Sequence, residues 1–169
     1  LVGTPYATLL ERIRELPGLD RRTTEIILAE VGPTVEKWPT AGHLASWACV
    51  CPGNHESGGK RYSGKRRKGQ KWLVSALVEA AHAASRSKDT YLAAQFHRLR
   101  ARRGAKRAAM AVAHSILTIV YHLIHKPEER FSELGGDFFL KKNKEQEERR
   151  AVRMLESLGF QVALTPLSA

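Results

Sequence analysis

Hydrophobic residues recur every three or four positions in three short stretches near the start of the chain, which is the period of an amphipathic helix. The stretches cover residues 5–15, 20–31 and 40–47, and the first two end at Leu16-Pro17-Gly18 and Gly32-Pro33. Because proline and glycine interrupt helices, the pattern predicts three short helices joined by turns. Asp20 and Thr40 stand where their side chains would cap the second and third helices.

Longer apolar patterns follow residue 71. Residues 72–84 carry one apolar face, and a further helix is expected to start at Ser87 or Asp89 and to reach Gly104. Residues 105–125 are apolar almost all round, but polar residues interrupt the run, so it falls short of the roughly 20 clean apolar residues that a membrane span needs. It therefore predicts a buried central helix, and no membrane partner is expected.

The C-terminal part is more polar. Residues 143–158 predict an amphipathic helix with Val152, Leu155 and Leu158 facing inward. Over residues 160–164, apolar and polar side chains alternate weakly, which predicts a short terminal strand. No region is rich in strands, so the predicted fold class is all-α. We expect a helix-hairpin-helix-like segment over 1–48, a basic glycine-rich loop over 49–71, a helical core over 72–127 and a tail helix over 128–169.

The charge is concentrated in the middle of the chain. The 169 residues carry a net charge of +11, yet residues 57–127 hold 16 basic residues against only Glu79 and Asp89. Solvated surfaces normally mix both signs, so this segment indicates contact with the phosphates of a nucleic acid. A basic membrane-surface helix is the minor alternative, because the first basic block contains four glycines and is no helix.

That first block is a loop of roughly fifteen residues, which is uncommon in a compact domain unless it is functional or disordered. Its cations are Lys60, Arg61, Lys65, Arg66, Arg67, Lys68 and Lys71. A second block without acids covers residues 98–107.

Ser57 begins the basic loop and precedes Gly58 and Gly59. A serine beside glycines and cations could attack phosphorus, with Lys60 and Arg61 stabilising the transferring charge. Serine is a weak nucleophile without a base, and only adjacency suggests His55 or Glu56 for that role. From residue chemistry alone, a serine that only binds a phosphate or caps a turn is the favoured interpretation.

The turn after the first predicted helix offers a second candidate site. In a helix-hairpin-helix module, a glycine-containing turn presents backbone N–H groups to a DNA phosphate, so Gly18 is a candidate, with Arg21 and Arg22 adding charge. Asp20 stands where such hairpins usually have a second glycine and would repel the phosphate. A plain αα-hairpin is about equally consistent with the sequence.

Metal-binding signals are weak. Cys49 and Cys51 have no second cysteine pair to complete a zinc site, so we expect buried free thiols in a reducing compartment. The two carboxylates within residues 57–127 are too few for a two-metal nuclease centre.

Several motifs in order resemble the C-terminal transposase domain of insertion-sequence 110/116/902 transposases, from about residue 10 to about residue 160. They include Leu16-Pro17-Gly18, Leu44-Ala45-Ser46-Trp47, Cys51-Pro52-Gly53-Asn54, Glu56-Ser57-Gly58-Gly59-Lys60, Arg67-Lys68-Gly69, Leu77-Val78-Glu79-Ala80-Ala81 and Leu134-Gly135-Gly136-Asp137-Phe138-Phe139. The sequence departs from the family where members often have glycine, asparagine and arginine at the positions of Cys49, Gln70 and Val74.

The resemblance implies a DNA transposase or recombinase in which Ser57 attacks the DNA backbone and forms a phosphoserine link. Mg²⁺ is expected in an acidic, RuvC-like N-terminal domain that this chain lacks, so the chain alone is expected to be inactive and to contain no cofactor. The resemblance also implies DNA as partner, a guide (bridge) RNA in some members, homo-oligomers of the full-length protein, and a bacterial, nucleoid-associated cytoplasmic location.

Overall fold

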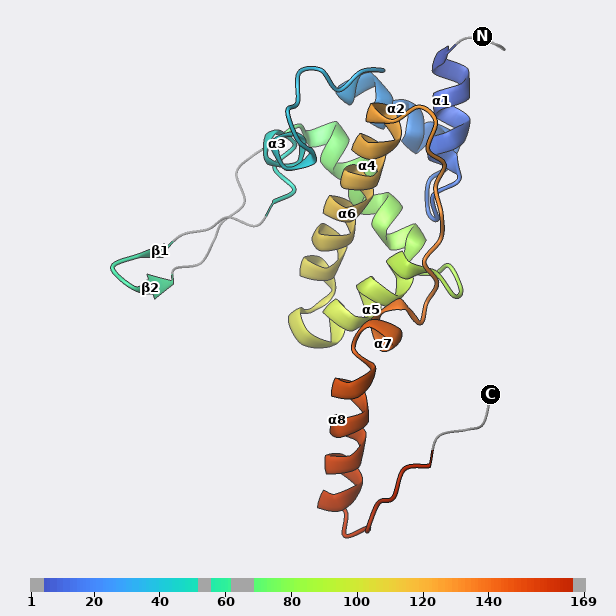
Figure 1. Cartoon of the computed structure of the whole chain (residues 1–169). Helices are drawn as coiled ribbons and strands as arrows, with labels where there is room; N and C mark the ends of the chain where they lie inside the picture. The colour runs from blue at the N-terminus through green and yellow to red at the C-terminus, as the bar shows by residue number, and fades with distance from the viewer. Residues whose placement is uncertain (1–4, 52–55, 62–68, 166–169) are drawn as a thin grey trace.

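The structure is a computed structural model that describes residues 5–51, 56–61 and 69–165. Eight helices and one two-stranded hairpin make up the regular structure of the described residues, which confirms the all-α prediction (Figure 1). The elements are α1 (Pro5–Arg14), α2 (Arg21–Val31), α3 (Ala41–Trp47), β1 (Glu56–Ser57), β2 (Lys60–Arg61), α4 (Lys71–Ala84), α5 (Tyr91–Arg103), α6 (Ala105–His125), α7 (Phe138–Lys142) and α8 (Lys144–Ser157).

The helix α6 forms the centre of the body, with α1, α3, α4 and α5 packed around it. Its length and composition alone would allow it to cross a membrane. Val112, Ile116, Leu117 and Val120 are nevertheless fully buried among the neighbouring helices, so α6 is the core helix that its sequence predicts. A single hydrophobic cluster runs from Leu9 to Ile124 and joins the N-terminal helices to the central ones.

The N-terminal helices begin where their caps predict. The carboxylate of Asp20 accepts a hydrogen bond from the Thr23 backbone N–H at 2.8 Å, and the hydroxyl of Thr40 accepts one from the His43 N–H at 3.4 Å. Each bond satisfies a backbone donor that has no partner within its helix. The segment between α2 and α3 is tied to the core because the Tyr121 hydroxyl donates to the Trp38 carbonyl oxygen at 3.0 Å.

The start of α5 differs from the prediction. The helix begins at Tyr91 and is capped by Thr90, whose hydroxyl accepts from the Ala93 N–H, not by Ser87 or Asp89. Asp89 has φ +52, in the left-handed region, whereas a capping residue has an extended backbone. The left-handed residue therefore belongs to the turn, and the helix starts after it.

The C-terminal part also departs from the prediction. The short helix α7 was not expected, and α8 contacts α7 but none of the other helices. Leu155 and Leu158 are consequently 40% and 64% exposed rather than inward, and Val152 is only half-buried. The predicted strand over 160–164 is wrong, since these residues are irregular and no described strand lies beside them to supply ladder hydrogen bonds. In Figure 1, α8 extends away from the helical body.

Candidate nucleic-acid interface

The described part of the basic loop contains a β-hairpin that the sequence reasoning missed. β1 pairs antiparallel with β2, with Ser57 opposite Lys60 and Glu56 opposite Arg61. The signal was present as two glycines between two short runs, which is a hairpin pattern. In Figure 1 the hairpin lies outside the helical body, and β1 and β2 contact each other but no helix.

Gly58 and Gly59 form the two-residue turn of this hairpin. Their φ angles are +58° and +73°, so both lie in the left-handed region that a tight hairpin of this length requires. A Cβ atom added to either glycine would meet no atom within 4 Å. The backbone conformation, and not a lack of space, is therefore what calls for glycine here.

This turn presents Ser57 to solvent beside a cation. Ser57 and Lys60 are both exposed, and directly paired residues on one face of an antiparallel ribbon have Cβ atoms about 4.5–5.5 Å apart. A phosphate that contacts the Ser57 hydroxyl is thus within reach of the Lys60 ammonium. The predicted contacts Lys65, Arg66, Arg67 and Lys68 lie outside the described residues.

The far end of the basic loop packs closely against the end of α3. A Cβ atom added to Gly69 would lie 2.6 Å from Cβ of Cys49 and 2.7 Å from the carbonyl oxygen of Ala48. Cys49 has φ +57°, in the left-handed region that favours glycine, so the backbone here is strained for a residue with a side chain. Lys71, another predicted contact, is exposed in the first turn of α4, immediately beyond this junction.

Cys51 lies at the N-terminal end of the basic loop, and its Sγ is 3.8 Å from Nδ1 of His114 on α6. Burial lowers the pKa of His114, because the charged imidazolium is poorly solvated there. Both cysteines are free, as predicted, but they are half-buried rather than fully buried. Among the described residues, no three His, Cys, Asp or Glu side chains come together in a way that could hold a metal ion.

At the turn between α1 and α2, Gly18 has φ +86 and lies against α4. An added Cβ would be 2.4 Å from the carbonyl oxygen of Ala80 and 2.5 Å from the backbone nitrogen of Ala84. Close packing between helices therefore accounts for this glycine, and its contact with a DNA phosphate stays a prediction.

The N-terminus of α2 is already occupied by the carboxylate of Asp20. The hydrogen bond from Thr23 lowers the pKa of Asp20, so its negative charge persists where a phosphate would bind. Arg21 pairs with Glu25 at 2.9 Å, and this bond raises the pKa of Arg21, while Arg22 is exposed. The structure thus gathers a capping acid and two arginines at this helix end.

Taken together, these features define a helical domain with one basic β-hairpin. Two glycines form the turn of this hairpin, and the hairpin exposes a serine. The model of the family described as Transposase IS116/IS110/IS902 matches residues 10–98, more than half of the chain, and extends from α1 into α5. The chain belongs to this transposase family. Membership assigns it a role in DNA transposition or recombination and implies interaction with DNA. A search of curated proteins finds no match to the chain.

Proposed function

We propose that this chain is the catalytic C-terminal domain of a DNA transposase, with Ser57 as the nucleophile. The supporting observation is the pairing of Ser57 with Lys60 across the Gly58-Gly59 turn, which leaves the hydroxyl exposed beside a cation. A nucleophile that must reach a phosphorus atom in duplex DNA has to be exposed, and a projecting hairpin meets that need.

In the proposed step, Oγ of Ser57 attacks the phosphorus of a backbone phosphodiester. A new O–P bond forms, the serine proton passes to a base, and the bond from phosphorus to one deoxyribose oxygen breaks. That oxygen leaves as a hydroxyl after taking up a proton, and the other DNA end stays attached to Ser57 as a phosphodiester. Lys60 would stabilise the charge on the non-bridging oxygens. The bond energy is conserved in the link, so a second hydroxyl can reverse the step and join new ends.

Mg²⁺ is proposed to act from an acidic RuvC-like domain outside this chain. Among the described residues, no three His, Cys, Asp or Glu side chains come together in a way that fits the ion, so its ligands would come from that domain, while Ser57 and Lys60 would act on the phosphate itself. We further propose that the full-length protein acts as a homo-oligomer in the bacterial cytoplasm at the nucleoid, and that a guide RNA is a second nucleic-acid partner.

A non-catalytic nucleic-acid-binding module is the alternative function. The same exposed hydroxyl and ammonium would serve a phosphate contact equally well, since both are hydrogen-bond donors to an anion. In that case Ser57 holds DNA in place and never becomes covalently attached.

The deciding experiment compares Ser57→Ala with Ser75→Ala in the full-length protein. Ser75 is also exposed, on α4, and serves as a matched control. Strand exchange and a covalent protein–DNA adduct on a denaturing gel are measured. Loss of both with Ser57→Ala alone supports catalysis. Unimpaired exchange with Ser57→Ala, or exchange without an adduct, removes Ser57 from the covalent step and favours the binding module.

A further inference from the structure

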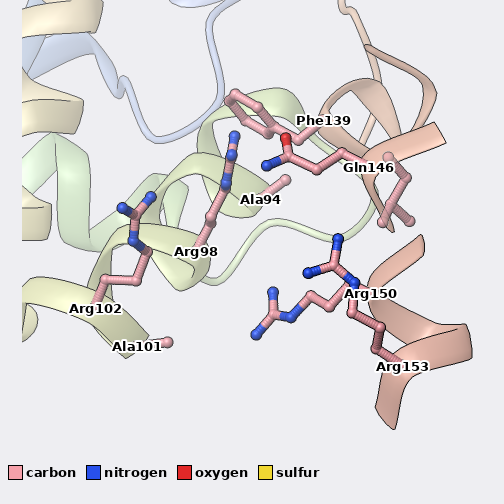
Figure 2. A pocket seen from close by; sticks show the side chains of 10 residues that line it. Ala94, Arg98, Ala101, Arg102, Phe139, Gln146, Arg150 and Arg153 are labelled. Atoms are coloured by element: carbon pink, nitrogen blue, oxygen red, sulfur yellow. The ribbon is translucent and has the colours of Figure 1, made fainter. Parts of the chain in front are cut away.

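Four arginines from two helices line one open cleft of about 750 Å³ between α5 and α8. Arg98 and Arg102 are four residues apart on α5, and Arg150 and Arg153 are three residues apart on α8, so each pair shares one face of its helix. In Figure 2 the guanidinium groups of Arg150 and Arg153 extend from α8 toward α5, whereas Arg98 points toward Phe139 and Arg102 lies on the α5 side of the cleft. The α5–α8 cleft therefore has basic side chains on two opposing walls.

One wall of the cleft is held in position by aromatic packing. The guanidinium carbon of Arg98 lies 4.9 Å from the ring centroid of Phe139, and the Phe139 ring stacks on Tyr91 at 5.2 Å between centroids. Tyr91 is in turn anchored, because its backbone N–H donates to the Glu133 carboxylate at 2.7 Å. The cation–π contact orients Arg98 without neutralising it, so its N–H donors remain available to an anion.

The described lining of the cleft contains no carboxylate. Neither Arg102 nor Arg153 forms a hydrogen bond or an ion pair with another described residue. Like charges facing each other across a cleft repel, and a bound anion would relieve that repulsion. Arginine on both walls suits phosphate in particular, since the planar guanidinium binds two phosphate oxygens at once.

The shape of the cleft favours one strand over a duplex. The other α5 residues that line the cleft, Ala94 and Ala101, have small side chains and leave the space open. A single phosphodiester chain can enter and meet arginines on both sides, whereas a duplex presents its phosphates on the outside of a wide cylinder. Gln146 adds an amide that can donate to and accept from a base edge.

We propose that the α5–α8 cleft binds a single strand of nucleic acid through its phosphates, at a site separate from the Ser57 hairpin. The match to the family ends at Arg98, so the α8 wall lies beyond the matched residues. The inference rests on the proposed function only in that the chain contacts nucleic acid. It does not require Ser57 to be a nucleophile.

The test measures binding of the whole 169-residue chain to labelled oligonucleotides of about 16 nucleotides by fluorescence anisotropy. The probes are single-stranded DNA, single-stranded RNA of the same sequence, and duplex DNA. Arg98→Gln/Arg102→Gln should weaken binding of the preferred single strand on the order of tenfold. The slope of log affinity against log salt should become shallower by about 1.4, since each lost contact contributes about 0.7 for single strands.

The matched control is Arg100→Gln/Arg103→Gln, which removes the same charge from α5 at positions that do not line the cleft. It should change the affinity by less than about threefold, which is half a power of ten. Arg102→Gln/Arg153→Gln repeats the test with one residue from each wall and keeps the Arg98–Phe139 contact, in case the first variant folds poorly.

A preference for single-stranded DNA or for single-stranded RNA identifies which nucleic acid the cleft takes. With either one, weaker binding by the cleft variants supports the proposed site. Equal losses in the cleft and control variants would overturn the proposal, because net charge alone would then explain them. Binding of the duplex without any single strand would also overturn it, while leaving the proposed recombinase function intact. Binding of no probe at all would count against both.

Discussion

Ser57 and Lys60 face each other across a two-residue turn, as directly paired residues of an antiparallel hairpin. Lys60, and not its neighbour Arg61, is the cation that the register places opposite the serine. The two cations next to the turn are therefore not equivalent, although the sequence alone treats them alike. This pairing leads to the first of five predictions.

Lys60→Gln should slow formation of the covalent adduct by about 100-fold, because one donor to the developing phosphate charge is lost. Lys71→Gln removes a charge at the start of α4 and should weaken DNA binding without slowing adduct formation at saturating DNA. Single-turnover kinetics of full-length protein separate the two effects. Equal rates in the Lys60→Gln variant and the wild type would remove Lys60 from the chemical step.

Gly58→Ala should reduce adduct formation while leaving the thermal midpoint of unfolding unchanged. Alanine disfavours φ +58 by about 1–2 kcal/mol, but the hairpin contacts no helix, so the strain stays local. Gly58→Asn is the matched control, since Asn-Gly is favoured in this type of turn. It should keep near-wild-type activity. A large fall in the unfolding midpoint of Gly58→Ala would contradict the separation of the hairpin from the core.

Gly18→Ala should lower stability by about 3 kcal/mol or more, from left-handed strain together with the clash against α4. Thermal or urea unfolding measures the loss. Gly104→Ala is a useful comparison, because Gly104 has φ +82 but no atom within 4 Å of an added Cβ. Gly104→Ala should lower stability only by the part that comes from the left-handed backbone strain. Equal losses at both positions would show that the approach to α4 is not tight.

Cys49→Gly should leave stability unchanged or raise it by up to about 1.5 kcal/mol. Relief of a left-handed backbone gains about 1–2 kcal/mol, while the added freedom of glycine in the unfolded chain costs about 0.5–1 kcal/mol. Cys51→Gly, at a position without positive φ, should lower stability instead. Urea unfolding of both variants checks the opposite signs.

Acid should destabilise the fold through His114. Burial lowers the pKa of His114 in the folded state below its ordinary value of 6.5, so the unfolded chain takes up the proton more readily. The stabilisation is fully present above pH 6.5 and is lost as the pH falls below that value toward the folded-state pKa. His114→Gln should therefore reduce the drop in unfolding midpoint between about pH 7.5 and pH 5.5. A drop as large as in the wild type would assign the acid sensitivity to other groups.

Local sequence rules were enough to predict the helical fold class, most helix ends and the location of the positive charge. These rules are a period of 3.6 residues for α4 and α6, side-chain caps at Asp20 and Thr40, and interruption by proline and glycine. The same periodicity misjudged α8. An apolar stripe predicts a buried face only when another element covers it, and no helix of the body covers Leu155 or Leu158.

Which residues meet in space depends on tertiary packing. The role of Gly18 in packing depends on α4, more than 50 residues away in the chain, whereas the register that sets Ser57 opposite Lys60 is local and depends on two glycines with positive φ. The α5–α8 cleft likewise joins arginines about 50 residues apart. Local pattern fixes the elements and the Ser57–Lys60 turn, but the spacing between distant side chains is set by how those elements pack, and that is what creates the α5–α8 cleft.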